Sequence, residues 1–387
     1  MKICIIANGY PSTKDPQFGC FEKDQAIALQ KKGHEVSILY VDGRFRTYWR
    51  NFGLFFVEEN GIKVFGLFLF PMSLLLKLNY KLHFKLRCKM LDWVFKYMLN
   101  YSQKPDVIYA HFLYNISYAT YLKKKYGIPL VGIEHWSELN KETLSKNIYY
   151  RGNIAYNYSD RIIAVSESLK KQIYRHFHHN SIVVHNMVGE EFFSQCSILD
   201  RNSDKIVFVS TGSLIKRKGY DVLIKALTTI SPKLGLWKLN IVGDGPERDN
   251  LQQMIDLYHL NDNITLLGRK NKQEIISLLH NSDVFLFPSR MENFSVAVLE
   301  ALSAGLPVVA TICGGIKECI DDKNGILVPV EDVDALANAI LDIYKNLRNY
   351  DRQVIADDCK NRFAPEVIAR QLTSIFEEVV SNHKNNK

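Results

Sequence analysis

The chain has 387 residues, of which 47% are hydrophobic and 23% are charged. These proportions are ordinary for folded proteins and argue against a disordered chain, while the length predicts about two domains of roughly 150 to 200 residues each. Residues 1–190 hold 26 Lys and Arg against 15 Asp and Glu, whereas residues 191–387 hold 23 against 26. The first half is therefore the basic half of the protein. The cysteines are scattered along the chain, which argues against a disulfide framework or a zinc site.

The first half alternates strands with helices. Strands are predicted at residues 2–7, 35–40, 62–67, 106–110, 130–133, 161–165 and 182–185, and helices fill most of the gaps between them. The apolar run 3–7 is too short for a signal peptide and is better explained as a first buried strand. We therefore expect a protein that is made and kept in the cytoplasm.

Residues 77–104 form the most basic segment of the chain, with seven Lys and Arg and a single acid, Asp92, among many apolar and aromatic residues. This composition is typical of a basic amphipathic helix, which can lie on the anionic inner face of the cell membrane. The alternative is a helix packed on its own domain with a solvated basic face. No transmembrane segment is expected, because the apolar run 64–76 is shorter than the roughly 20 residues that a spanning helix needs.

The second half begins after a polar segment, residues 194–204, which is the best candidate for a linker. Strands are predicted at residues 205–211, 238–242, 264–267, 284–287, 307–311 and 325–328. Strands that alternate with helices indicate parallel sheets with right-handed crossovers. The predicted fold class is therefore α/β, with two doubly wound domains.

The segment 288–318 carries the strongest functional signal. It places Glu292 before a predicted helix at 294–304 and Glu300 inside that helix, followed by a strand and the loop Gly314-Gly315. A strand, loop, helix, strand and glycine loop in this order have the form of a ligand crevice at the carboxyl edge of a parallel sheet. The segment resembles the glutamate-x7-glutamate signature of retaining, nucleotide-sugar-dependent glycosyltransferases of family 4, including the flanking Pro-Ser and Ala-Gly-x-Pro-Val-Val-Ala-Thr.

The resemblance extends over nearly the whole chain. Further matching segments lie at residues 5–11, 32–36, 105–111, 164–168, 184–186, 211–214, 218–219 and 241–247. It implies the GT-B fold, in which two Rossmann-like domains face each other across a cleft. Residues 1–193 would form the acceptor-binding domain together with a returning C-terminal helix at about 365–387, and residues 205–364 would form the nucleotide-sugar-binding domain.

The expected chemistry requires positive groups, because negative charge builds on the leaving diphosphate when the bond to the sugar breaks. The N-terminus of the helix after Glu292 can supply a positive dipole end, and Lys218 a mobile charge. In the family a lysine matching Lys218 contacts the diphosphate, and an arginine usually stands where this chain has Ser213. Arg217 or Lys216 would have to replace that cation.

The resemblance also assigns the rest of the donor site. The residue matching Glu300 binds the ribose hydroxyls, the one matching Glu292 binds and positions the transferred sugar, and the main chain near Arg269 reads the base, so UDP and GDP both remain open. The implied donor-binding residues are Gly19, Gly212, Ser213, Arg217, Lys218, Gly243, Arg269, Glu292, Asn293, Phe294, Ser295, Val296 and Glu300.

Four residues of the first half are candidates for the same site. Gly19 is expected near the donor phosphates, although the family usually has two glycines where this chain has Phe18 and Gly19. His111 ends a strand and is a candidate for sugar contact or proton handling, since histidine titrates near neutrality. With Glu292 and Lys218 it makes up the catalytic set, while His111, His135 and Trp136 are the acceptor-binding candidates.

No metal or other cofactor is expected, and no nucleic-acid partner. Asp332 and Asp334 have the spelling of an Asp-x-Asp metal site, but they directly precede a predicted helix, so capping explains them better. The histidines at 176, 178 and 179 lack a matching carboxylate or cysteine cluster.

The sequence therefore predicts a retaining, metal-independent glycosyltransferase that moves a hexose-type sugar from a UDP- or GDP-sugar to a glycan or lipid-linked acceptor. The resemblance and the basic first half favour bacterial surface polysaccharides such as lipopolysaccharide, capsule or exopolysaccharide. Two alternatives stay open: a GT-B nucleotide-sugar epimerase, and a non-catalytic nucleotide-binding scaffold, which the departures at Ser213 and Phe18 would suit.

Overall fold

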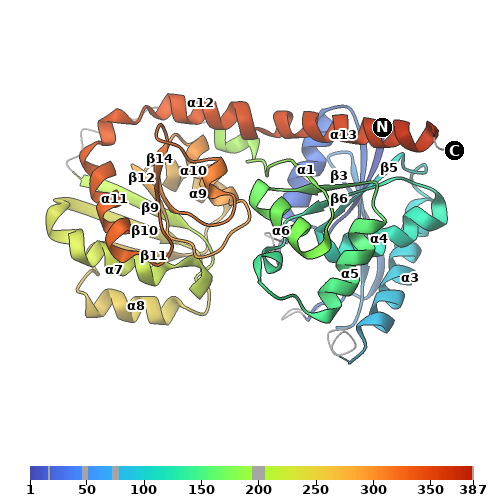
Figure 1. Cartoon of the computed structure of the whole chain (residues 1–387), viewed down its shortest axis with the longest axis horizontal. Helices are drawn as coiled ribbons and strands as arrows, with labels where there is room; N and C mark the ends of the chain where they lie inside the picture. Colours follow the sequence, from blue (N-terminus) through green and yellow to red (C-terminus); the bar gives the residue numbers. More distant parts are fainter. Residues whose placement is uncertain (16–17, 46–50, 72–77, 194–204, 386–387) are drawn as a thin grey trace. The chain divides into compact units, whose positions relative to one another are not determined.

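The protein was analysed as a computed structural model that describes residues 1–15, 18–45, 51–71, 78–193 and 205–385. The chain divides into two compact units. The first contains Met1–Val184 together with Pro365–Lys387, and the second contains His185–Ala364. Each unit is built on one β-sheet flanked by helices (Figure 1).

The sheet of the first unit has eight strands in the order β3-β4-β2-β1-β5-β6-β7-β8. Their bounds are β1 Lys2–Ile6, β2 Glu35–Asp42, β3 Gly53–Glu59, β4 Ile62–Phe68, β5 Val107–His111, β6 Leu130–Glu134, β7 Arg161–Ala164 and β8 Ile182–Val183. The strand order reverses between β1 and β5, which places a topological switch point at the carboxyl ends of these two strands.

Strand β3 was not predicted, and it makes this sheet mixed rather than purely parallel. It pairs antiparallel with β4, whereas the other neighbouring strands pair parallel. The connection is the tight turn Asn60-Gly61, whose residues have φ of 52° and 78°. An Asn-Gly pair tolerates positive φ at both positions and is a strong hairpin signal, so the sequence did contain the information.

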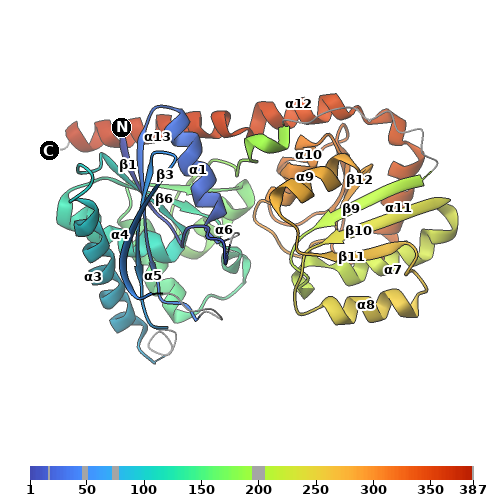
Figure 2. The ribbon, with the colours of Figure 1, turned by 180° about the vertical axis from the view of Figure 1, so that it is seen from behind.

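Helices cover both faces of the first sheet (Figures 1 and 2). Helix α1 (Cys20–Lys31) packs with α13 (Pro365–Asn385). Helix α4 (Phe112–Tyr126) packs with α3 (Tyr80–Met98) and α5 (Lys146–Asn157), and α5 also contacts α6 (Glu167–Phe177). The C-terminal helix belongs to the unit through its buried face. The Phe376 ring lies 5.0 Å from the Tyr109 ring, and Thr373 Oγ1 lies 2.8 Å from His34 Nε2.

The sheet of the second unit has six strands, all parallel, in the order β11-β10-β9-β12-β13-β14. Their bounds are β9 Lys205–Thr211, β10 Leu236–Val242, β11 Ile264–Gly268, β12 Val284–Phe287, β13 Val308–Thr311 and β14 Gly325–Val328. The strand order reverses between β9 and β12, so the switch point lies at their carboxyl ends. All six strands were predicted from the sequence to within two residues at each end.

The second sheet also carries helices on two faces (Figures 1 and 2). Helices α7 (Tyr220–Ile230), α8 (Arg248–Leu257) and α11 (Val333–Lys345) pack as one group, and α9 (Lys272–His280), α10 (Val296–Ser303) and α12 (Arg352–Phe363) as another. Between sheet and helices lies a core of aliphatic side chains that includes Leu223, Leu239 and Ile340. This core fixes the strand ends from which the donor-site candidates extend.

The boundary between the units differs from the predicted one. Residues 185–193 belong to the second unit, not the first. Asn186 Nδ2 donates to the Phe294 carbonyl at 2.9 Å, and Val188 N–H donates to the Phe363 carbonyl at 3.1 Å. These contacts join segments more than 100 residues apart, so no local pattern marked them. The predicted linker, 194–204, lies outside the described residues.

In the described part of the chain, no helix combines the length and the apolar character that crossing a bilayer would take.

We expect truncation of Phe376, a residue of α13, to destabilise the first unit, because the Phe376 ring is completely buried. Phe376→Ala should cost about 3 to 5 kcal/mol of unfolding free energy, as removal of a buried phenyl group does. Phe70→Ala, which removes a phenyl ring that is 72% exposed, is the matched control and should cost less than about 0.5 kcal/mol. Chemical unfolding monitored by circular dichroism measures both; equal effects would show that α13 does not stabilise this unit.

Candidate active site

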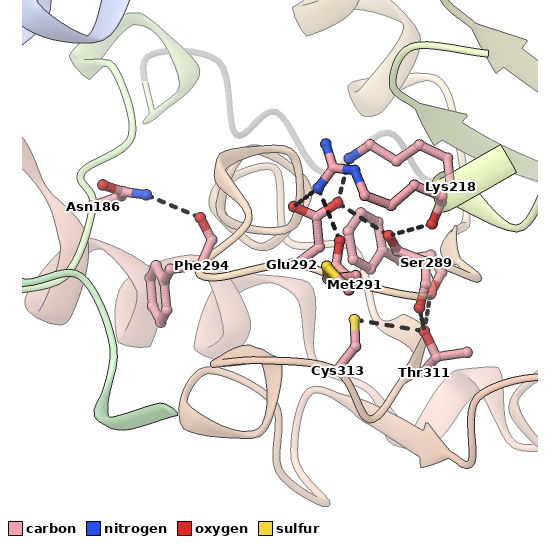
Figure 3. A network of polar contacts seen from close by, with 10 residues as sticks. Asn186, Lys218, Ser289, Met291, Glu292, Phe294, Thr311 and Cys313 are labelled. Carbon is pink, nitrogen blue, oxygen red and sulfur yellow. Dashed lines mark hydrogen bonds and ion pairs between the residues drawn. The ribbon is translucent and has the colours of Figure 1, made fainter. Parts of the chain in front are cut away.

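The switch point of the second unit brings two charged side chains together. Lys218 ends the short 3₁₀ helix η3 (Lys216–Lys218) that follows β9, and Glu292 lies in the loop between β12 and α10. Lys218 Nζ donates to Glu292 Oε1 at 2.6 Å (Figure 3). Their side chains are only 14% and 12% exposed, so the ion pair is shielded from most solvent.

Two further donors surround the Glu292 carboxylate. Ser289 Oγ lies 3.0 Å from Glu292 Oε1, and Ser289 is completely buried (Figure 3). Arg217 Nη1 lies 3.7 Å from Glu292 Oε2 and donates to the Met291 carbonyl at 2.9 Å. The carboxylate is thus held by a lysine, an arginine and a hydroxyl. From the sequence, Ser289 was noted only as part of the Pro-Ser motif, and its contact with Glu292 was not predicted.

A second ionic network, which the sequence analysis missed, holds the loop that carries Lys218. The Arg290 guanidinium makes two hydrogen bonds of 2.8 Å with Asp221, at the start of α7. It also donates to Glu331 and to the Lys216 carbonyl, while Arg290 N–H donates to the Arg217 carbonyl at 2.8 Å. Arg290 therefore fixes η3 against the β12–α10 loop. Nothing in the local sequence distinguished it from a surface arginine.

Two glycines allow the close backbone contacts of this site. Gly219 has φ of +67°, and a Cβ there would lie 2.0 Å from the Pro288 carbonyl oxygen. Gly314 has φ of +56°, and a Cβ there would lie 1.8 Å from the Glu292 carbonyl oxygen. A side chain at either position would collide with backbone in a conformation that L-residues rarely adopt.

The N-terminus of α10 adjoins Glu292, and the first backbone N–H groups of an α-helix have no partner within the helix. Its N-cap residue, Ser295, makes no side-chain capping hydrogen bond. The helix starts at Val296, two residues later than predicted, and Asn293, Phe294 and Ser295 form the buried turn before it. Glu300 lies in the helix and is half-buried. A free helix N-terminus carries partial positive charge and favours a phosphate.

The remaining donor candidates of this unit are more dispersed. Gly212 and Gly243, at the ends of β9 and β10, are in contact, since a Cβ on Gly243 would meet the Gly212 carbonyl oxygen at 1.9 Å. Ser213 is exposed, and Arg269 is exposed after the edge strand β11. The structure gathers Arg217, Lys218 and Glu292 closely, and places Arg269 two strands away from β9.

Asp332, the first residue of the Asp-x-Asp motif, caps a helix, as predicted. Asp332 accepts a hydrogen bond of 2.8 Å from Ala335 N–H at the start of α11. Among the described side chains, no group of three or more His, Cys, Asp or Glu is arranged to hold a metal ion.

The switch point of the first unit carries the other candidates. His111 ends β5 and is completely buried, and within the part of the chain that the structure describes neither of its ring nitrogens has a hydrogen-bond partner. Its ring stacks on that of His135, with centroids 5.4 Å apart and planes at 12°. Burial, and then the charge of His135, hold the pKa of His111 well below its usual value, so it is a neutral imidazole. Gly19, with φ of +80°, caps α1.

Backbone strain follows directly after His111. Phe112 has φ of +67°, which is rare for a bulky residue and costs on the order of 1 to 3 kcal/mol. The Phe112 ring lies 5.1 Å from the His135 ring. The turn that presents His111 is therefore held in an unusual conformation by its surroundings, as happens most often at functional sites.

Glu134 is a buried acid in this region to which the sequence analysis assigned no role. Its carboxylate accepts hydrogen bonds from the backbone N–H groups of His135 and Trp136, at 3.0 and 2.9 Å, and from the Tyr156 hydroxyl at 3.0 Å. Complete desolvation nevertheless raises the pKa of Glu134 to about 7. The sequence signal that could have identified Glu134 is its position as an acidic residue at the end of an otherwise apolar strand.

Comparison with protein families gives matches over most of the chain. Residues 23–192 match the model described as "Glycosyltransferase Family 4", and residues 194–356 match "Glycosyl transferases group 1". Among curated relatives, N-acetyl-alpha-D-glucosaminyl L-malate synthase of Bacillus anthracis is 24% identical over the full length of both chains. The putative colanic acid biosynthesis glycosyltransferase WcaL of Escherichia coli is 32% identical over 44% of each chain.

Solved structures share the whole architecture. Sucrose-phosphate synthase of Thermosynechococcus elongatus has a TM-score of 0.80 at 18% identity and covers 99% of this chain and all of its own. HepE of Anabaena, in complex with UDP-glucose, has a TM-score of 0.72 at 20% identity, over 98% of this chain and all of its own. The lipopolysaccharide outer core galactosyltransferase WaaB has a TM-score of 0.69 at 20% identity, over 98% of this chain and all of its own.

Two α/β units of this topology make up the GT-B fold. The chain belongs to glycosyltransferase family 4. The family and fold expected from the 288–318 segment and its companions are thus confirmed. Relatives of this chain are named for roles in colanic acid and lipopolysaccharide assembly.

The raised pKa of Glu134 predicts a pH-dependent cost to stability. Between its usual value of 4.5 and about 7, the folded protein keeps the Glu134 proton while the unfolded chain loses it. The unfolding free energy should therefore fall as the pH rises through this window, by roughly 3 kcal/mol in total, and then level off.

Glu134→Gln isolates this contribution, because glutamine can accept from the two N–H groups and donate to the Tyr156 hydroxyl without ionising. Urea unfolding at a series of pH values from 5 to 8 should show wild type losing stability relative to the variant. A difference that stays constant with pH would mean that Glu134 titrates normally.

Proposed function

We propose that this enzyme transfers a hexose-type sugar from a UDP- or GDP-sugar, with retention of anomeric configuration and without a metal ion, to a glycan or lipid-linked acceptor. The observation that carries the donor half is the buried Lys218–Glu292 pair beside the free N-terminus of α10. It supplies a cation and a dipole for the leaving diphosphate, and a carboxylate for the sugar.

The diphosphate is held by Lys218, Arg217 and the first turn of α10. Arg217 supports this role because its guanidinium already lies 3.7 Å from the Glu292 carboxylate, whereas Ser213, which stands where the family usually has arginine, bears no charge. When the phosphates draw the two cations away, Glu292 is released to accept hydrogen bonds from sugar hydroxyls. Substrate binding therefore replaces one set of charge-assisted contacts with another.

The ribose and the base of the donor are assigned to two further parts of the second unit. Glu300, on the half-buried side of α10, would accept from the ribose hydroxyls, and the main chain near Arg269 would read the base. The structure of HepE is a complex with UDP-glucose, which favours UDP-sugars as the first donors to test. With lysine, arginine and a helix dipole available, neutralising the diphosphate does not require a metal ion.

The acceptor side is proposed to use His111, His135 and Trp136 of the first unit. A neutral imidazole whose nitrogens are unpartnered can accept a hydrogen bond from an attacking hydroxyl and take its proton, and His111 meets this description. The names of WcaL and WaaB support an acceptor in surface polysaccharide assembly, whereas the Bacillus anthracis relative is named as an N-acetyl-alpha-D-glucosaminyl L-malate synthase.

We further propose that the outward face of α3 contacts an anionic membrane surface. The opposite face is packed in the unit through residues such as Leu91 and Phe95, so the segment is both a core helix and a basic surface. Exposed residues in and just before the helix include Leu78, Lys81, Leu82, Lys85, Lys89, Trp93 and Lys96. Asp92 points inward, where it binds Lys125 and Tyr126 and pairs with Lys96 at 3.5 Å, and among the described residues Lys85 and Lys89 form no ion pair. Lysine and large apolar side chains together suit a charged lipid interface.

The membrane proposal predicts charge-dependent binding to vesicles. Wild type should sediment with phosphatidylcholine vesicles that contain phosphatidylglycerol and be released by salt, while Lys85→Glu with Lys89→Glu should lose most of this binding. Lys323→Glu with Lys360→Glu, exposed lysines of the second unit, is the matched control. Equal binding of the two double variants would contradict a role for α3.

The donor-site proposal predicts loss of sugar transfer on removing either partner of the pair. Lys218→Met and Glu292→Gln should each lower turnover by at least about a hundredfold, because each removes charge stabilisation or sugar positioning. Lys270→Met, which breaks a surface pair with Glu274, is the control and should stay near wild type.

The assay follows nucleotide release from a panel of UDP- and GDP-sugars over membranes that carry the acceptor, with and without EDTA. EDTA should leave the rate unchanged. Interconversion of the free donor without transfer would indicate an epimerase, and activity that survives both substitutions would rule out catalysis by this pair.

A further inference from the structure

Arg151, in the middle of α5, is a buried cation without a counter-ion. Its side chain is completely buried among α3, α4 and α5. Among the residues that the structure describes it forms no ion pair with a carboxylate, and its Nη1 has no hydrogen-bond partner. Burying a charge is costly unless it is paired, so this position calls for an explanation beyond packing.

Three aromatic rings and two uncharged acceptors hold the guanidinium. Its Cζ atom lies 5.3 Å from the Phe84 ring, 4.9 Å from the Tyr114 ring and 5.0 Å from the Tyr118 ring. Nη2 donates to the Tyr80 carbonyl at 3.3 Å and to His83 Nδ1 at 3.1 Å. Cation–π contacts of this kind offset part of the desolvation but leave the positive charge uncancelled.

The remaining contact of Arg151 fixes the direction of a hydrogen-bond chain. Arg151 Nε lies 2.8 Å from Asn147 Oδ1, and since arginine can only donate, the Asn147 oxygen must face it. The Asn147 amide nitrogen then donates to the Tyr114 hydroxyl at 2.8 Å. The Tyr114 oxygen is the acceptor in this bond, so its own proton is free to be donated, and no described group receives it.

The Tyr114 hydroxyl belongs to the carboxyl edge of the first sheet. Tyr114 lies in the first turn of α4, three residues after His111, and Trp136 follows two residues after the end of β6. Their ring centroids are 5.2 Å apart with planes at 60°, and both side chains are partly exposed. A sugar ring lying on the indole would therefore bring an oxygen within reach of the Tyr114 proton.

The charges around this site favour an anionic oxygen. Arg87 lies on the other side of Tyr118, with its Cζ atom 5.4 Å from that ring, and adds a second cation. Of the two nearby acids, Glu138 is paired with Lys141 at 2.6 Å, and the pKa of Glu134 is raised to about 7 by burial. His83 is neutral, because burial and Arg151 lower its pKa to about 4.

We propose that Tyr114 donates a hydrogen bond to an anionic oxygen, of a phosphate or a carboxylate, on the sugar acceptor of this enzyme, whose ring stacks on Trp136. Arg151 is a positioning residue that acts through Asn147, orienting the Tyr114 hydroxyl as a donor and keeping the local potential positive. The inference rests on the proposed function for the existence of an acceptor, and it adds the acceptor's charge.

Three sugars that share a glucose ring distinguish the sources of the charge: methyl α-glucoside, methyl α-glucuronide and glucose 6-phosphate. They are titrated into the full-length protein by calorimetry, at neutral pH and constant ionic strength. At least one charged sugar should bind at least about tenfold more tightly than the neutral glucoside, the difference typical of a hydrogen bond to a charged group. Similar affinities for all three, or no binding of the charged sugars, would overturn the proposal.

Three variants test the roles of the residues. Tyr114→Phe removes one oxygen and should bring the charged-to-neutral affinity ratio close to one. Tyr118→Phe, the matched control on the same helix and at the same distance from Arg151, should keep the ratio. Arg151→Lys retains a cation but loses the Nε donor to Asn147, and should lower the ratio.

The affinity ratio does not depend on the folded fraction, so a merely structural effect would leave it unchanged. Persistence of the wild-type ratio in Tyr114→Phe would contradict the proposal. UDP binding, measured on the same samples, reports separately on the donor site. It should be equal in all three variants and wild type. Failure of the acceptor proposal can therefore be distinguished from failure of the proposed donor site.

Discussion

The proposed donor site depends on one ion pair, between Lys218 and Glu292, at the point where the strand order of the second sheet reverses. A pair that is nearly buried is strong only if its geometry is fixed, and three features fix it. Ser289 contributes a third contact to the carboxylate, Arg290 clamps the loop of the lysine, and Gly219 lets that loop approach the Pro288 carbonyl. The charges are thus positioned before any substrate arrives.

In the proposed mode of donor binding, each partner of the pair occupies the place of a substrate group. The lysine meets a carboxylate where the diphosphate would lie, and the carboxylate meets a cation where sugar hydroxyls would lie. Exchange of partners on donor binding costs little, because a charge-assisted contact is replaced by another of similar strength. The first unit uses a different principle: His111, Glu134 and Arg151 are buried polar groups, and His111 and Arg151 lack some of their hydrogen-bond partners among the described residues.

Much of this could be predicted from the sequence, because it depends on local pattern. The strands of the second unit and the signature around Glu292 and Glu300 are encoded in consecutive residues. What the sequence did not reveal depends on contacts between distant segments. Ser289 and Arg290 gain their importance from a loop more than 70 positions earlier, and residues 185–193 are assigned to the second unit by contacts with Phe294 and Phe363.

Two misses have other causes. The β3–β4 hairpin carries the Asn60-Gly61 turn, so its signal was present in the sequence. The altered pKa of Glu134 and the lone charge of Arg151 arise from complete burial, which depends on how three helices pack on the sheet. Neither an acid at a strand end nor an arginine in a helix shows its degree of burial from its neighbours in sequence.

The central claim is that Lys218 holds the donor diphosphate and Glu292 the donor sugar. Calorimetric titration of a nucleoside diphosphate and its matching sugar nucleotide, into wild type, Lys218→Met and Glu292→Gln, tests it most directly. Lys218→Met should weaken both ligands by a similar factor. Glu292→Gln should bind the diphosphate at least as tightly as wild type, since its lysine is freed, but lose the additional affinity of the sugar. Wild-type binding of the diphosphate by Lys218→Met would contradict the account.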